Sequence, residues 1–331
     1  MATFKHISSK NADYGAAEQY LTFEHDEFTM KPTLDGNGQL VIRDDYRISS
    51  LNCGEEDFAI ACMRSNLKYG KNQKREDVKS HHYIISFDPR DAPDNGLTVD
   101  RAQALGEEFC KTHFPGHQAL VCTHPDGHNH SGNIHVHIVI NSLRIAEVPL
   151  LPYMERPADT REGCKHRCTD AAMEYFKAEV MEMCHRENLY QIDLLNGSKN
   201  RVTEREYWAK RKGQAALDKE NASQAATGEP PKQTKFETDK EKLRRTIRAV
   251  LSSAVSFEDF SGKLLQQGVT VKESRGRLSY LTPDRTKPIT VRKLGDDLTV
   301  PPYWKHSPKT HRTPPEPPKT PLPKQEYPRS H

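Results

Sequence analysis

The sequence of 331 residues has no long hydrophobic run. Its first ten residues lack the apolar segment of a secretion signal, and no later stretch approaches the length needed to span a bilayer. We therefore expect no insertion into a membrane and a location in the cytoplasm of the cell that makes the protein.

The sequence also lacks an even set of cysteines and a strong net charge. Seven scattered cysteines are typical of reduced thiols rather than of a secreted disulfide scaffold. The formal net charge is +3, and the segment 301–331 contributes six Lys and Arg against two Glu, so the rest of the chain is nearly neutral. Bulk charge therefore does not indicate nucleic-acid binding, and function has to be argued from a site.

Segments typical of strands and of helices follow one another in mixed order through the first 150 residues. This order favours an α+β fold, with a central antiparallel β-sheet and flanking helices, over a doubly wound parallel sheet. The expected strands cover residues 3–7, 39–43, 81–87, 117–123 and 134–142.

Beyond residue 152 the pattern becomes helical, and the composition then changes twice. We place a catalytic domain with C-terminal helices at 1–220 and a linker rich in Ala, Gln, Gly and Pro at 221–236. A small accessory unit of two helices and three strands, an α/β arrangement, follows at 237–300. Residues 301–331 hold ten of the 22 prolines and are expected to form an extended, disordered tail.

The most informative segment reads HPDGHNHSGNIHVHIVIN and begins at His124. Side chains alternate along a strand, so His135 and His137 project from the same face. His124 ends the preceding strand, and the connection, rich in Gly, Asn and Ser, can turn the chain back so that this third imidazole meets the pair. Three nitrogen ligands with an otherwise open coordination sphere are typical of a catalytic metal site.

Alternatives exist for several residues of this segment. A lone histidine in a strand is usually a surface or core residue, but two polar rings on an apolar strand are costly to bury without a ligand. His128 and His130 are either loop residues or replacements for His124 in the triad. Asp126 is a candidate acceptor for an imidazole N–H, which fixes the tautomer of a ligand.

The histidine segment resembles the third motif of relaxases, the mobilisation nucleases of conjugative elements within the HUH endonuclease superfamily. Ser80–Phe87 resembles the strand that precedes this motif, and Ala16–Leu21 resembles the family's N-terminal tyrosine motif. The likeness covers about residues 1–145. Segments 205–208 and 257–299 are similar, to a lesser degree, to accessory parts of mobilisation proteins from Gram-positive elements.

The resemblance implies nicking of one DNA strand at an origin of transfer through a 5′-phosphotyrosyl intermediate. It implies Tyr20 as the nucleophile, in the helix that the family places over the metal, with Tyr14 and His25 as alternatives. The implied cofactor is a divalent metal, Mg or Mn. Single-stranded origin DNA, accessory mobilisation proteins and a type IV coupling protein are the implied partners, in a bacterial cytoplasm.

Two other functions are compatible with these residues. A rolling-circle replication initiator shares the histidine metal site, and a non-catalytic DNA-binding mobilisation protein can retain the histidines without the reaction. The single tyrosine motif upstream of the histidines favours the relaxase order.

Two further segments carry functional side chains. Tyr207 and Trp208 lie among basic residues that can grip phosphates while the rings stack on bases of single-stranded DNA, although a solvated helix face explains the same pattern. A second segment has enough soft ligands for zinc, but its spacing is not a strong zinc pattern and half-buried thiols explain it equally well. The basic residues are Lys210, Arg211 and Lys212, and the soft ligands are Cys164, His166, Cys168 and Cys184.

Overall fold

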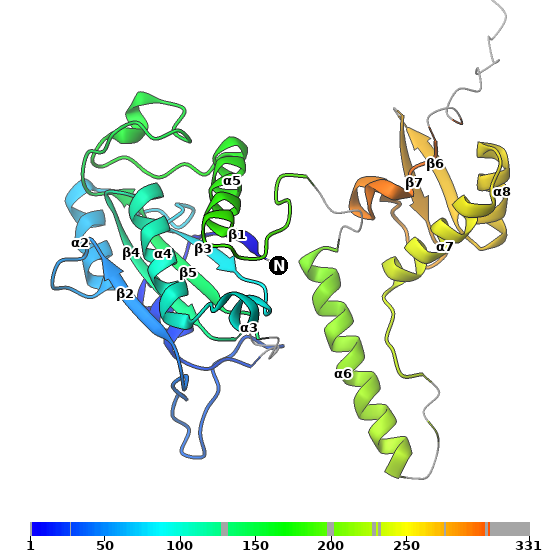
Figure 1. Cartoon of the computed structure of the whole chain (residues 1–331), viewed down its shortest axis with the longest axis horizontal. Coiled ribbons are helices and arrows are strands. Elements are labelled where there is room, and N and C mark those ends of the chain that lie inside the picture. Colours follow the sequence, from blue (N-terminus) through cyan, green and yellow to red (C-terminus); the bar gives the residue numbers. More distant parts are fainter. Residues whose placement is uncertain are drawn as a thin grey trace, which may run out of the picture. The chain divides into compact units, whose positions relative to one another are not determined.

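The computed structural model describes residues 2–26, 28–126, 132–196, 202–226, 233–274 and 276–301, together with residues 230 and 304. The chain divides into two compact units, residues 1–197 and 198–331 (Figure 1). The boundary therefore falls earlier than residue 220, where the sequence analysis expects the first domain to end.

A five-stranded antiparallel sheet forms the centre of the first unit, with strand order β1-β3-β5-β4-β2. The middle strand is β5, and its neighbours are β3 and β4. This arrangement confirms the expected α+β fold and places the strands of the histidine motif side by side. The strands are β1 (Thr3–Ser9), β2 (Arg47–Leu51), β3 (Ser80–Ser86), β4 (His117–His124) and β5 (His135–Arg144).

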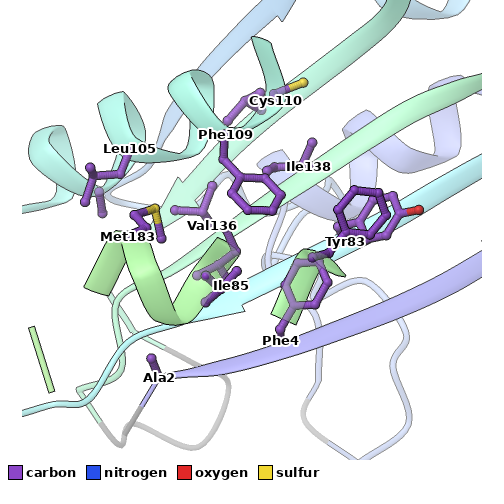
Figure 2. Close-up of a cluster of buried hydrophobic side chains, with 14 of the residues drawn as sticks. Ala2, Phe4, Tyr83, Ile85, Leu105, Phe109, Cys110, Val136, Ile138 and Met183 are labelled. Carbon is purple, nitrogen blue, oxygen red and sulfur yellow. The ribbon is translucent and has the colours of Figure 1, made fainter. Parts of the chain in front are cut away.

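Helices cover both faces of this sheet, and each face has its own core. On one face, Phe109 of α4 and Phe176 of α5 pack against Tyr83, Val136 and Ile138 of the central strands (Figure 2). On the other face, α1 and α2 pack against side chains of β4 and β5. The helices of the first unit are α1 (Gly15–Thr22), α2 (Phe58–Tyr69), α3 (Asp91–Asn95), α4 (Val99–His113) and α5 (Asp170–Arg186), with a 3-10 turn at Pro157–Thr160.

Local sequence signals explain where the two longest helices of this unit begin. The hydroxyl of Thr98 accepts a hydrogen bond from the backbone N–H of Arg101 at the start of α4, and Thr169 caps α5 through Ala172 in the same way. Phe109 and Leu105 then lie on the face of α4 that contacts the sheet (Figure 2). The caps therefore fix the rotation that directs the apolar stripe of each helix towards the core.

Residues 23–46 form an arm between α1 and β2, seen as the blue loop that projects from the first unit (Figure 1). The arm folds back on itself through isolated bridges such as Phe23 with Ile42. Asp35 caps the turn at its tip by accepting hydrogen bonds from two backbone N–H groups. The segment 39–43, expected as a strand, therefore pairs within the arm and does not join the central sheet.

The described part of the second unit contains three α-helices and a small antiparallel sheet of order β6-β7-β8. Its first helix, α6, belongs here because buried Glu206 pairs with buried Arg244 of α7, and Phe236 packs against Gly213 of α6. Residues 221–226, expected in the linker, are part of this helix. The elements are α6 (Glu204–Ala226), α7 (Asp239–Ser253), α8 (Phe257–Gln266), β6 (Thr270–Ser274), β7 (Arg277–Leu281) and β8 (Ile289–Thr290), with 3-10 turns at Val291–Lys293 and Asp296–Leu298.

Most of the expected proline-rich tail lies outside the described residues. Trp304 is an exception, because its ring packs 6.4 Å from that of Phe260 in the core of the second unit. Within the described part of the chain, no helix combines the length and the apolar character that crossing a membrane requires.

Candidate metal centre and catalytic site

The three histidines predicted as metal ligands meet on one face of the central sheet. The pairing of β4 with β5 sets His124 directly opposite His135, and Cys122 opposite His137, so all four side chains point to the same side. One ring nitrogen from each histidine lies within 4.8 Å of the others. The two remaining histidines of the motif, His128 and His130, lie outside the described residues.

Two of the three imidazoles have their proton fixed by a backbone carbonyl. His124 Nε2 lies 2.8 Å from the carbonyl oxygen of Leu21, and His135 Nδ1 lies 3.0 Å from that of Asn133. A carbonyl only accepts, so these nitrogens donate and the opposite nitrogens keep a lone pair. Those two lone-pair nitrogens, His124 Nδ1 and His135 Nε2, are 3.3 Å apart and turned towards one another.

The third imidazole is oriented by a fourth histidine, His82 of β3. His137 Nδ1 lies 2.8 Å from His82 Nε2. If His137 Nδ1 donates this hydrogen bond, its Nε2 is left with a lone pair on the side of the other ligands. Burial lowers the pKa of His137 and of His135 below the usual value, so both rings are neutral near pH 7 and able to bind a metal. The donor set therefore fits a divalent cation.

Tyr20 lies against this cluster on helix α1. Its half-buried ring is 6.1 Å from the ring of His137 and 6.4 Å from that of His82, measured between centroids. The next residue, Leu21, supplies the carbonyl that holds His124, so the helix carrying the phenol and a predicted ligand are joined directly. His25 is also near, with its ring 5.1 Å from that of Tyr20 and its Nδ1 3.0 Å from the carbonyl of Phe23.

Tyr14, the alternative nucleophile, lies in a different environment. Its hydroxyl donates to the carbonyl of Lys79 at 3.0 Å and accepts from Asn66 Nδ2 at 2.8 Å. Burial, the largest cause, raises the pKa of Tyr14 to about 12. A buried phenol with its hydrogen bonds satisfied fits a structural role in the core formed by α1 and α2.

Asp126 stands at the start of the motif's loop. Its Oδ1 accepts a hydrogen bond from the backbone N–H of Gly132 at 2.7 Å, and its charge acts on His135 to favour the protonated ring. The groups bonded to the three imidazoles are the carbonyls of Leu21 and Asn133 and the ring of His82. A role for Asp126 as an acceptor of that kind stays a prediction.

Residues 42–148 match the relaxase family described as MobA/VirD2-like, nuclease domain. The matched segment contains His82 and all three histidines of the cluster. The first unit therefore contains a segment similar to the nuclease domain of relaxases. Tyr20 precedes the matched residues, so its assignment depends on the position of helix α1.

The chain is also similar to curated proteins and to solved structures. The chain is 26% identical over 251 residues to a protein rlx of Staphylococcus aureus, which covers 75% of this chain. It spans 60% of that relative's length.

Among solved structures, a chain from the work titled "Molecular Basis of Vancomycin Resistance Transfer in Staphylococcus aureus" is 14% identical. The matched region covers 56% of this chain and 92% of that chain, with a TM-score of 0.35. The metal-bound structure of the conjugative relaxase TrwC in complex with oriT DNA is 11% identical. The matched region covers 82% of this chain and 93% of that chain, with a TM-score of 0.30.

The basic and aromatic residues expected to bind DNA lie on α6, in the second unit rather than in the unit that contains the histidine triad. Lys210 forms an ion pair with Glu241, and the rings of Tyr207 and Trp208 pack 5.3 Å apart. Lys212 is exposed. DNA binding by this helix, including Arg211, stays a prediction.

The soft ligands considered for zinc do not gather. Cys184 is buried in the core between α5 and the sheet, whereas the ring of His166 is bonded to the Tyr83 hydroxyl at 2.7 Å. Cys168 Sγ lies 3.5 Å from His6 Nδ1. Among the described residues, the group of His, Cys, Asp and Glu close enough to hold a metal is the triad on β4 and β5.

Sequence reasoning missed two partners of the triad. His82 lies within a segment that the sequence analysis used only for its resemblance, and its role becomes visible when β3 pairs with β5. The alternation along β3 could be read from the sequence and places His82 and Ile84 on one face. The pairing of β3 with β5 could not be read in this way. The Leu21 carbonyl had no signal in the sequence, because a backbone group carries no residue-specific pattern.

Proposed function

We propose that this chain nicks one strand of DNA at an origin of transfer, in a metal-dependent transesterification with Tyr20 as the nucleophile. The observation that carries the proposal is the position of Tyr20 beside His137, on a helix whose Leu21 carbonyl binds His124. The match to the relaxase nuclease domain supports the same reaction class. The reaction would start mobilisation of a conjugative element.

The proposed reaction exchanges one phosphodiester for another. A bond forms between Tyr20 Oη and the scissile phosphorus, and the bond from phosphorus to the 3′-oxygen breaks. The phenolic proton passes to solvent, and the leaving 3′-oxygen takes a proton to become a hydroxyl. The 5′-phosphotyrosyl bond resembles the bond that it replaces, so the same residue can later rejoin a strand.

A tyrosine phenol is a weak nucleophile near pH 7, because its usual pKa is about 10. A Mg²⁺ or Mn²⁺ ion held by His124, His135 and His137 would polarise the scissile phosphate. The protein's own contribution is geometric: α1 holds the phenol over the face of the sheet from which the three imidazoles project.

The proposed substrate is single-stranded origin DNA, with accessory mobilisation proteins and a type IV coupling protein as partners in a bacterial cytoplasm. The TrwC structures similar in fold class were determined in complex with oriT DNA. The basic residues of α6 would add contacts to the sugar-phosphate backbone.

A covalent-adduct assay tests the proposal. The probes are end-labelled single-stranded oligonucleotides that tile the DNA flanking the gene, incubated with the full chain and Mn²⁺ and resolved on a denaturing gel. We expect an adduct with one oligonucleotide, and loss of that adduct by roughly 10³-fold or more in Tyr20→Phe. Tyr14→Phe is the matched control, because it removes a buried hydroxyl from the same helix region and should keep the adduct.

Each of the other possible results points to a different nucleophile, DNA target or activity. An adduct that survives Tyr20→Phe but is lost on brief acid treatment indicates a phosphohistidine at His25. Cleavage at a replication origin indicates a rolling-circle initiator with the same chemistry. If the wild-type chain gives no adduct with any divalent metal, the protein is a DNA-binding module and the proposed reaction is wrong.

A further inference from the structure

Arg43 stands where the arm returns to the helix that carries Tyr20. Its backbone N–H donates to the carbonyl of Thr22 at 3.0 Å, immediately beyond Leu21, and the neighbouring Ile42 bridges Phe23. Two contacts of the backbone therefore fix Arg43 at the C-terminal end of α1. A residue 23 positions later in sequence than Tyr20 is thus held beside it.

The Arg43 side chain is partly buried. Its charge acts on the Tyr20 phenol, on the Cys122 thiol and on the Glu24 carboxylate. Cys122 stands opposite His137 in the pairing of β4 with β5, so the charge of Arg43 acts close to the face on which the phenol and the imidazoles meet.

This guanidinium has a donor that the described protein does not use. Arg43 Nε is enclosed and has no hydrogen-bond partner among the described residues. An enclosed N–H without an acceptor costs free energy, and such groups in native proteins usually have a functional explanation. Burial also lowers the pKa of Arg43, which indicates that part of the charge has lost its contact with water.

Charge balance indicates what completes the site. Arg43 and a metal ion held by the triad are both cations, and bringing them to one site is unfavourable unless an anion lies between them. Glu24 lies near Arg43 and offsets part of its charge. A phosphate has oxygens on several sides and can face both cations at once.

We propose that Arg43 is a catalytic residue that binds a non-bridging oxygen of the scissile phosphate opposite the histidine triad. This proposal rests on the proposed nicking reaction and adds a residue to it. As Tyr20 Oη bonds to phosphorus and the bond to the 3′-oxygen breaks, negative charge concentrates on the non-bridging oxygens. The Nε and Nη donors of Arg43 stabilise that charge in the transition state more than in the ground state.

The first experiment needs no DNA. Isothermal titration calorimetry measures Mn²⁺ binding to the full chain, with and without inorganic phosphate, for wild type, Arg43→Gln and Arg43→Lys. Without phosphate, Arg43→Gln should bind Mn²⁺ about threefold to tenfold more tightly, because a repelling charge has been removed. Phosphate should strengthen Mn²⁺ binding in wild type and in Arg43→Lys, and by clearly less in Arg43→Gln.

Arg47→Gln is the matched control for this titration. Arg47 lies four residues further along the chain, but its guanidinium pairs with Asp45 and Asp100 on the exposed surface. Its removal should leave both Mn²⁺ titrations unchanged. If Arg43→Gln also leaves both unchanged, Arg43 does not face the metal and phosphate, and the proposal is overturned.

The second experiment uses the oligonucleotide that forms an adduct with the wild-type chain. Arg43→Gln should slow adduct formation by about 10²–10³-fold, and Arg43→Lys should recover part of the rate. Binding of Tyr20→Phe to this oligonucleotide without metal is then compared with binding to one that carries an uncharged methylphosphonate at the cut position. Neutralising this phosphate should weaken binding in the presence of Arg43 and have little effect after Arg43→Gln.

The two experiments separate failure of this inference from failure of the proposed function. If no oligonucleotide forms an adduct with wild type, the nicking reaction is wrong, while calorimetry still decides whether Arg43 acts with a phosphate at the triad. If adducts form at equal rates with and without Arg43, the reaction stands and Arg43 has no part in it.

Discussion

At the scale of single residues, the position of each imidazole proton determines what the histidine cluster can bind. Leu21 and Asn133 supply carbonyl acceptors, which leave one ring nitrogen of His124 and of His135 with a lone pair. His137 depends instead on another side chain, His82. A neutral imidazole can donate or accept, so this third orientation is the one that a single substitution can change.

Replacement of His82 by Ala is expected to weaken Mn²⁺ binding by about 10–100-fold, because His137 loses the group that orients it. Calorimetric titration with Mn²⁺ measures the effect, and His82→Asn should recover part of the affinity by restoring an acceptor. His81→Gln is the control, since the adjacent side chain projects from the opposite face of β3. Equal losses in His81→Gln and His82→Ala would contradict the orienting role of His82.

At the scale of elements, the site depends on how closely α4 lies against β4 and β5. Gly106 sits in the middle of α4, and a Cβ placed on it would lie 2.3 Å from Cγ1 of Val136 and 3.3 Å from Cγ1 of Val121. Val136 separates His135 from His137 along β5. The absence of a side chain at residue 106 therefore lets the helix support the two ligand positions from the back of the sheet.

Gly106→Ala is expected to destabilise the first unit. Overpacking at Val136 costs about 1–3 kcal/mol, which exceeds the gain of at most about 1 kcal/mol from the helix propensity of alanine. Urea unfolding followed by circular dichroism measures the difference. Gly262→Ala in α8 is the control, because no atom lies within 4 Å of its added Cβ and only the propensity gain should appear. A Gly106→Ala variant as stable as wild type would show that α4 can move away from the sheet.

At the scale of the whole molecule, the first unit buries many neutral imidazoles besides the metal ligands. His6, His81 and His166 form a cluster on the face of the sheet opposite the triad, and His117 lies 5.5 Å from His166. Burial lowers the pKa of His81 and of His117 to about 3, with Arg144 adding to the shift of His117. Folding therefore keeps these rings uncharged over the whole neutral range.

The stability of the first unit is expected to fall on acidification. Each ring has a pKa near 6.5 when unfolded and a lower one when folded, so the unfolded chain binds more protons below about pH 6.5. The stabilisation is complete above that pKa and is lost as pH falls towards the folded values. The slope approaches about 1.4 kcal/mol per pH unit for each histidine, measured by urea unfolding between pH 7.5 and pH 5.

Two variants test whether the buried histidines cause this dependence of the unfolding free energy on pH. Burial lowers the pKa of His113 to about 4 even though the Glu179 carboxylate lies 3.6 Å from its Nε2. His113→Gln should reduce the slope, whereas His185→Gln, at an exposed position on α5, should leave it unchanged. Stability that rises on acidification over this range would contradict the assignment.

The sequence by itself determined the local features of this protein. Alternation along a strand put His135 and His137 on one face, and the mixed order of elements indicated an antiparallel sheet. These conclusions depend on neighbours within a few residues, where backbone geometry permits few arrangements.

The tertiary structure decided what crosses the sheet or closes a long loop. Only the pairing of β3 with β5 brings His82 to His137, and only the return of the arm brings Arg43 to Tyr20. The membership of α6 in the second unit was decided by the burial of Glu206 against Arg244, which its charged sequence does not announce. Such contacts join residues far apart in the chain, and their energy depends on packing that no local pattern encodes.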